Sequence, residues 1–245
     1  MGKNLIQQKR GKGSSTFRAH GFNGIGDVKL MNNKTGGVIV DIQTSRFHSA
    51  PIAVVKYNDG EQGFLIAPEG IIVGQSITIG PSAELVPGNA MNLADIPDGA
   101  FVYNIEGQPG DGGKFARGSG VAARVLSRSG NLVSVMLPSK KIHKFNPLCR
   151  ALLGTVAGGG RPEKPFVKAG NKFMEMKSKN RYWPKMTGAA MNAVSHPFGG
   201  KRTSRKGRPT IAPHNAPPGR KVGMIRPRKT GRARGTRVRS SGGSA

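Results

Sequence analysis

The stretch from Gly36 to Ala67 reads GGVIVDIQTSRFHSAPIAVVKYNDGEQGFLIA and decides the fold. It holds three short runs rich in Val, Ile and Phe, and polar or turn-forming residues separate them. Asn58, Asp59 and Gly60 stand between the second and third runs, and Asn and Gly tolerate the positive φ angles of a hairpin turn. Apolar runs of this length bounded by turn residues are typical of β-strands. The stretch therefore predicts strands joined by a tight hairpin.

The same pattern continues as far as Gly160. The further runs are EGIIV, SITIG, AFVYNIE, VAARVLSR, NLVSVMLPS, KKIHKF and ALLGTVAGG. Ser129, Gly130 and Asn131 predict a second hairpin turn. Many short strands at regular spacing indicate barrels, because a closed sheet has no exposed edge. We predict a mainly β protein with two small barrels.

The boundary between the barrels is expected in residues 81–97, where three prolines interrupt the strand pattern. This divides the chain into a basic N-terminal extension over residues 1–36, a first barrel over 37–84, a second barrel over 85–170 and a basic C-terminal extension over 171–245. One helix is predicted from about Lys168 through Asn180. The aromatic residues that alternate with aliphatic ones are expected in the core; they are Phe47, Tyr57, Phe64, Phe101 and Tyr103.

Charge is segregated along the chain. The formal net charge is +27, yet residues 27–111 hold ten of the twelve acidic residues. From Met176 to Ala245 there are eighteen Lys or Arg residues and no Asp or Glu. Blocks of like charge without apolar residues stay unfolded until a polyanion neutralises them. Nucleic acid is the expected partner. An anionic membrane is not, because no basic amphipathic helix with a wide apolar face is predicted.

The arginines of the C-terminal extension are separated by Gly, Ser, Thr and Pro. Small neighbours let the backbone enter narrow crevices, and the guanidinium fork matches phosphate geometry. This favours insertion into folded RNA, although a DNA-compacting protein would share the charge. The residues expected to bind RNA are Lys9, Arg10, Lys12, Arg18, Lys114, Arg117, Lys185, Asn192, His196, Lys201, Arg202, Arg205, Lys206, Arg208, Arg220, Lys221, Arg226, Arg228, Lys229, Arg232, Arg234 and Arg237.

The segment GAAMNAVSHPFGG, residues 188–200, is the one stretch that resembles a functional site, with paired glycines and a single imidazole at His196. A general base needs a partner that orients it, and the nearest acidic residue in the sequence is Glu175. We expect a loop that packs on RNA, with catalysis by His196 or a purely structural histidine as alternatives. The neighbouring Phe173, Met176, Tyr182 and Trp183 are expected to form a packing cluster, with base stacking as the alternative.

Other catalytic and metal patterns are absent from the sequence. The remaining histidines are isolated, and the single Cys149 cannot form an internal disulfide or a zinc knuckle. The segment Gln108–Phe115, QPGDGGKF, departs from a phosphate-binding loop motif, and we expect a tight turn that meets RNA phosphates or a plain loop between strands. No signal-peptide or membrane-spanning run is present. We expect an intracellular, cytoplasmic protein that is not an enzyme and has no metal site or cofactor of its own.

Several long motifs resemble the L2 family of large-subunit ribosomal proteins, in the right order and over nearly the whole chain. They are RGKGSSTFRAH (10–20), APEGIIVGQSITIG (67–80), PGNAMNLADIPDGAFVYNIEGQPGDGGKFARGSG (87–120), CRALLGTVAGGG (149–160) and GAAMNAVSHPFGGKR (188–202). The segment KAGNKFMEMKSKNRYWP and the long basic ending resemble the archaeal and eukaryotic branch. Bacterial members commonly read DHPHGG where this chain has Ser195 to Gly200, so it lacks their acid and their second histidine.

The resemblance implies an OB-like barrel followed by an SH3-like barrel, with extended basic N- and C-terminal tails. It also implies a structural, primary rRNA-binding protein of the large ribosomal subunit that supports subunit association, tRNA binding and the peptidyl-transferase region. The implied partners are large-subunit rRNA, neighbouring ribosomal proteins and small-subunit RNA at the subunit interface. Structural Mg or K ions would be held by the surrounding RNA. The resemblance also carries the proposal that the residue matching His196 takes part in peptidyl transfer.

Overall fold

The structure is a computed structural model that describes residues 2–200, 209–225 and 227. The chain divides into two compact units. One runs from His20 to Lys172 and contains the β-sheets, and the other combines Met1–Ala19 with Phe173–Ala245.

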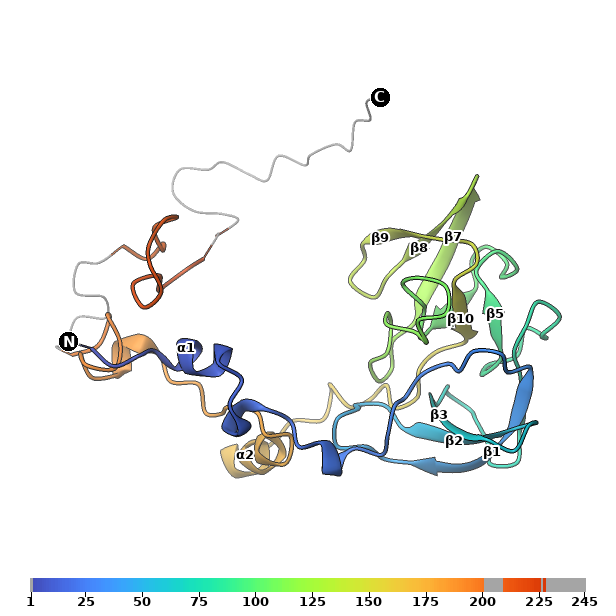
Figure 1. Cartoon of the computed structure of the whole chain (residues 1–245), viewed down its shortest axis with the longest axis horizontal. Helices are drawn as coiled ribbons and strands as arrows, with labels where there is room; N and C mark the ends of the chain where they lie inside the picture. Colours follow the sequence, from blue (N-terminus) through green and yellow to red (C-terminus); the bar gives the residue numbers. More distant parts are fainter. Residues whose placement is uncertain (1, 201–208, 226, 228–245) are drawn as a thin grey trace. The chain divides into compact units, whose positions relative to one another are not determined.

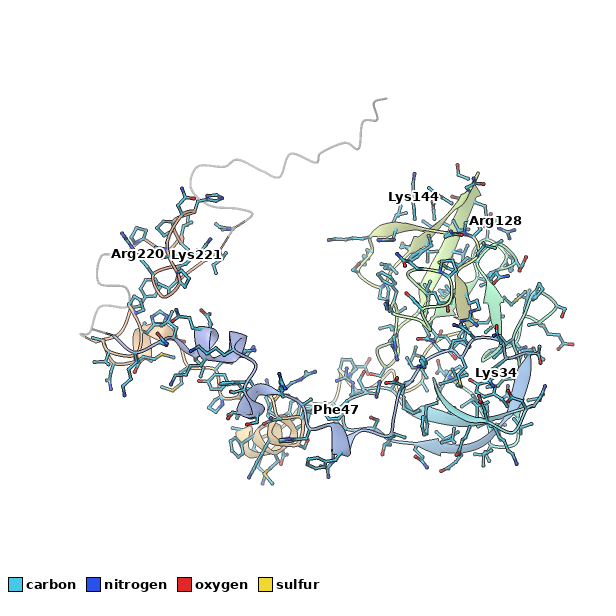
Figure 2. All side chains as sticks on the ribbon, in the orientation of Figure 1. Lys34, Phe47, Arg128, Lys144, Arg220 and Lys221 are labelled. Carbon is cyan, nitrogen blue, oxygen red and sulfur yellow. The ribbon has the colours of Figure 1, made fainter. Side chains whose placement is uncertain are left out.

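The first sheet is antiparallel and has the strand order β3-β2-β1-β4. Its strands are β1 (Gly36–Gln43), β2 (Ile52–Tyr57), β3 (Gln62–Ile66) and β4 (Ser76–Thr78). The predicted hairpin joins β2 to β3, and Gly60 has a φ of 87° in its turn. Lys34, labelled in Figure 2, fixes this hairpin through ion pairs with Asp59 and Glu61.

The second sheet is also antiparallel and has the order β5-β10-β6-β7-β8-β9. Its strands are β5 (Ala90–Asn92), β6 (Phe101–Tyr103), β7 (Ala123–Ser129), β8 (Leu132–Met136), β9 (Ile142–Phe145) and β10 (Arg150–Leu153). Figure 1 shows the long β7–β8 hairpin beside β9. Its turn lies at the predicted residues, because Ser129 pairs with Leu132.

The two sheets enclose two cores. Buried residues of β1 to β4 surround Ile39, Ile52 and Leu65, together with Ala90, Tyr103 and Leu152 of the second sheet. The other core holds the remaining buried residues of the second sheet, such as Val102 and Val125. The mainly β prediction is confirmed, and the two sheets fit an OB-like barrel followed by an SH3-like barrel. The domain limits 37–84 and 85–170 remain a prediction.

Three details differ from the sequence prediction. The run EGIIV is not a strand, because turns at its two ends leave Ile72 and Val73 exposed. The short strand β5 lies within residues 81–97, where the prolines were expected to interrupt the strand pattern. Phe101 was expected in the core, yet its side chain is 57% exposed, because it begins β6 on the outer face of the sheet. Tyr57 and Tyr103 are buried as predicted.

The second unit has little regular structure in its described part. It contains the short helix α1 (Ile6–Gly11), and helix α2 spans Ala169–Ser178, close to the predicted range. Single 3₁₀ turns occur at Ser15–Phe17 and Gly188–Ala190, and at Gly21–Asn23 in the sheet-containing unit. Among the described residues, no helix combines the length and the apolar character needed to cross a membrane.

Candidate nucleic-acid interface

The segment from Gly188 to Gly200 folds into a closed loop held by its own backbone. The amide of Gly200 donates to the Met191 carbonyl at 2.9 Å, and the amide of Ser195 donates to the Asn192 carbonyl at 2.9 Å. The amide of Gly199 donates to the His196 carbonyl at 2.9 Å. Because these bonds satisfy the loop internally, its shape does not depend on a regular helix or strand.

Two glycines allow the loop to close. A Cβ added to Gly188 would lie 2.3 Å from Cε1 of the His196 ring, so the imidazole packs on the bare backbone of residue 188. A Cβ added to Gly199 would lie 2.3 Å from the Asn192 carbonyl oxygen. Both distances are too short for any side chain. Gly188 and Gly199, two glycines of the predicted site, therefore serve close packing.

His196 is held in one tautomer. Its Nδ1 accepts a hydrogen bond from the Phe198 amide at 3.0 Å, and the Phe198 ring lies 5.2 Å from the imidazole. Because Nδ1 is an acceptor, the proton of the neutral ring resides on Nε2, which remains a donor. Partial burial lowers the pKa of His196 from its ordinary value and so favours this neutral form. Within the described residues, no carboxylate contacts the ring.

The N-terminal segment packs against this loop. The amide of Lys3 donates to the Val194 carbonyl at 2.8 Å, and Leu5 is buried. Three neighbouring hollows, of about 360, 400 and 440 Å³, all include His196 in their walls. Two segments from opposite ends of the sequence therefore build one surface around the imidazole.

The predicted RNA-binding residues of this unit lie on its exterior. Lys9 and Arg10 occupy the last turn of α1, and Lys12 follows as its C-cap. The exposed residues are Lys9, Arg10, Lys12, Arg18, Lys185, Asn192 and Arg220. Lys221 is half-buried and donates from Nζ to the His214 carbonyl at 3.0 Å; Figure 2 labels it beside Arg220.

Half of the predicted list lies outside the described residues. These positions are Lys201, Arg202, Arg205, Lys206, Arg208, Arg226, Arg228, Lys229, Arg232, Arg234 and Arg237. All members of the predicted packing cluster lie within the described residues. The rings of Phe173 and Trp183 lie 6.4 Å apart, whereas Tyr182 lines the hollow of about 360 Å³.

The glycine-rich loop at residues 107–113 makes tight turns, with positive φ at Gly110, Gly112 and Gly113. Its amides are not available to bind a phosphate, because they already donate hydrogen bonds to the chain's own carboxylates. Glu106 accepts from the amides of Gly110 and Gly112 at 3.1 Å, and Asp111 accepts from those of Gly107, Gln108 and Gly113. Any contact between this loop and a phosphate must therefore be made by side chains.

The two predicted cations of this region differ in position. Lys114 is exposed and pairs with Asp111 at 3.2 Å. Arg117 is half-buried, and its guanidinium donates to the carbonyls of Gly113 at 2.9 Å and Val28 at 2.5 Å. Arg117 thus ties the loop to the segment before β1, and its predicted contact with RNA must use its remaining donors.

Glu106 is the main buried charge of the sheet-containing unit. It is fully buried, and Oε1 lies 2.6 Å from Nη2 of Arg150, whose backbone amide donates to Oε2 at 2.9 Å. Burial alone would raise the pKa of Glu106, but the hydrogen bonds and charge of Arg150 and the loop amides outweigh it and lower the pKa. The carboxylate therefore stays ionised and organises the loop.

The structure also shows a basic surface that was not predicted from the sequence, which we call the β7–β9 surface. Its members are exposed and lie on or between the last strands of the second sheet; Figure 2 labels Arg128 and Lys144 there. They are Arg124, Arg128, Lys140, Lys141 and Lys144. The sequence feature that could have indicated this surface is the strongly positive charge of the chain beyond residue 111. Among the described residues, no group of His, Cys, Asp and Glu is suited to hold a metal ion.

Comparison with known proteins identifies the family. The family described as Ribosomal Proteins L2, RNA binding N-terminal domain, matches residues 3–79. The family described as Ribosomal Proteins L2, C-terminal domain, matches residues 86–219, more than half of the chain. This chain belongs to the ribosomal protein L2 family.

Archaeal members of the L2 family are similar along their whole length. The protein of Natronomonas pharaonis named large ribosomal subunit protein uL2 is 50% identical over 236 residues, which cover 95% of this chain and 97% of that protein. Proteins of the same name from Haloarcula marismortui and Methanocella arvoryzae are each 48% identical and cover 95% and 94% of this chain, and 98% and 99% of their own. The resemblance to the archaeal type is confirmed.

Proposed function

We propose that this chain is a structural, RNA-organising constituent of the large ribosomal subunit in the cytoplasm. Its sheet-containing unit docks on the RNA surface, and the unit built from the two chain ends neutralises phosphates within the folded RNA. The L2 family membership and the distribution of charge support this function.

The observation that carries the proposal is the charge of the unit formed by Met1–Ala19 and Phe173–Ala245. Its sequence holds twenty-three Lys or Arg residues and one acidic residue, Glu175. That acid is already paired with Lys179 at 2.6 Å. Such a surplus of cations needs phosphate counterions, and a folded RNA supplies them at high density.

Catalysis by His196 is not the function we propose. Within the described residues, the only hydrogen bond of the ring is the one that Nδ1 accepts from the Phe198 amide. A general base in acyl transfer needs an orienting acceptor for its N–H and a free lone pair for the substrate proton. Here the lone pair accepts from the backbone, and no residue that the structure describes accepts the N–H, which is the arrangement of a hydrogen-bond donor to RNA.

We further propose specific partners. The β7–β9 surface offers a second set of cations on the other unit, suited to a second RNA segment such as small-subunit RNA at the subunit interface. The acid-rich first sheet is suited to neighbouring basic ribosomal proteins. We assign the chain no cofactor; Mg or K ions near it would be bound by RNA. The four-part division at residues 36, 84 and 170 belongs to the same proposal.

The experiment compares retention of the full chain on folded large-subunit rRNA and on duplex DNA over a series of salt concentrations. Each phosphate neutralised on duplex DNA contributes about −0.9 to the slope of log K against log salt. We expect binding to DNA to vanish at moderate salt, and binding to rRNA to persist because shape contacts add to charge. Equal loss from both would contradict a ribosomal function and indicate a general DNA-compacting protein.

A further inference from the structure

The hollow of about 360 Å³ beside His196 is built from the two ends of the chain. One wall is the segment from Lys3 to Gln7, and the other is formed by residues of the loop together with Tyr182. The bond from the Lys3 amide to the Val194 carbonyl and the buried Leu5 hold the walls together. Pockets for small ligands begin at roughly 300 Å³, so this cavity suits a ligand of about the size of one nucleobase.

Part of the lining is aromatic or rich in sulfur. The half-buried Tyr182 lines the cavity, together with Met186 and Met191. Nucleobases that leave the RNA stack are held on aromatic faces, and methionine adapts to flat, irregular ligands. A phosphate group alone would gain little from contact with an aromatic ring and thioether side chains.

The rest of the lining offers hydrogen bonds. The Gln7 amide, the Ser195 hydroxyl and the Tyr182 hydroxyl make no hydrogen bond to any residue that the structure describes. The Nε2–H of His196 is a further donor, because Nδ1 is already engaged. An amide and hydroxyls in one pocket can pair with the donors and acceptors on the edge of a base.

Two cations stand at the same cavity. Lys3 and Lys9 are exposed, and neither forms a salt bridge within the part of the chain described by the structure. None of the residues lining the cavity is acidic. This charge excludes a basic peptide as the occupant and favours a ligand that carries phosphates.

We propose that this cavity binds one unstacked nucleobase of RNA, with the base against Tyr182 and its flanking phosphates on Lys3 and Lys9. The inference rests on the proposed function, since the base belongs to the RNA that the chain organises. It adds a base-specific contact to an interface otherwise described by charge and shape.

The test uses large subunits isolated from cells that carry the wild-type chain, Tyr182→Ala or Tyr182→Phe, and probes base reactivity with dimethyl sulfate and a carbodiimide. In the Tyr182→Ala particles we expect one single-stranded base to become roughly tenfold more reactive, the change expected for loss of one stacking contact. Tyr182→Phe keeps the ring and should leave that base protected. Gln7→Ala, which keeps the packing of the loop, should expose the same base less strongly.

Unchanged base reactivity in both Tyr182→Ala and Gln7→Ala particles would overturn the inference and reduce the interface to phosphate contacts. If Tyr182→Ala failed to enter particles, Gln7→Ala alone would decide, with a reactive base as support and no change as refutation. Absence of the wild-type chain from the particles is a different result: it would overturn the proposed function, and the inference with it.

Discussion

The imidazole of His196 lies directly on the backbone of Gly188. A Cβ at residue 188 would come within 2.3 Å of Cε1, 2.4 Å of Nδ1 and 2.7 Å of Nε2 of the ring. The ring therefore occupies the space that any side chain at 188 would need. Nδ1 of the same ring accepts a hydrogen bond from the Phe198 amide. Gly188 and His196 together determine the shape of the loop, so the loop is sensitive to changes at either residue.

Gly188→Ala should open this loop. The added methyl group displaces the imidazole and breaks the bond from the Phe198 amide, at an expected cost of about 1–3 kcal/mol for overpacking. Hydrogen exchange at the Gly199 and Gly200 amides should become faster. The matched control is Gly170→Ala, because a Cβ at that position meets no described atom within 4 Å apart from its chain neighbours and its own helix backbone. Unchanged exchange in Gly188→Ala would show that the ring does not support the loop.

The loop should weaken in acid. Burial lowers the pKa of His196 in the folded state, so the neutral form contributes stability that is complete above its unfolded value of about 6.5 and is lost as the pH falls through the lower folded value. Protonation also removes the acceptor for the Phe198 amide. Exchange of that amide, corrected for its intrinsic pH dependence, should rise as the pH is lowered from about 7.5 to 5.5, a range that begins above the ordinary histidine pKa of about 6.5 and ends below it. In His196→Gln the corrected exchange should not vary with pH; the same rise in that variant would assign it to another group.

Glu106→Ala should destabilise the sheet-containing unit strongly. It leaves the half-buried Arg150 guanidinium without its carboxylate and frees the amides of Gly110 and Gly112, so we expect a loss of about 3–5 kcal/mol. Denaturant unfolding of the full chain measures it. The control is Asp98→Ala, which breaks an exposed pair with Arg128 at 3.7 Å and should cost about 0–1 kcal/mol. Equal effects from the two variants would contradict the organising role given to Glu106.

Removal of residues 201–245 should leave the sheets folded. The unit from His20 to Lys172 contains none of the deleted residues, so its strand signal in circular dichroism is expected to persist. Incorporation into large subunits should fall sharply, because fourteen of the eighteen cations of the acid-free ending are lost with the segment. Collapse of the strand signal would contradict the division into barrels and extensions.

Local sequence signals predicted the hairpins well. The turns at Gly60 and Gly130 have the positive φ that Gly favours, 87° and 57°, and the runs on either side pair as expected. The run EGIIV misled because its composition fits a strand, whereas the turns around it leave Ile72 without a partner strand. The core prediction for Phe101 was wrong for a similar reason, since composition does not show which face of a strand is buried.

For the site, the motif was visible and its internal chemistry was not. The loop could be recognised from the sequence because its glycines and His196 lie close together, with Gly188 only eight residues before His196. The burial of Glu106 against Arg150 could not be predicted, since these two residues are forty-four positions apart and only the fold brings them together. The β7–β9 surface depends likewise on the pairing of three strands.

Sedimentation of a tagged full-length chain from its own cells tests the central claim most directly, with the ribosomal particles washed in high salt before the gradient. A protein whose extensions are threaded through folded RNA should remain in the large-subunit peak, in a constant ratio to its rRNA, after loosely bound basic proteins have been released. Recovery of the chain at the top of the gradient or with DNA would contradict the account.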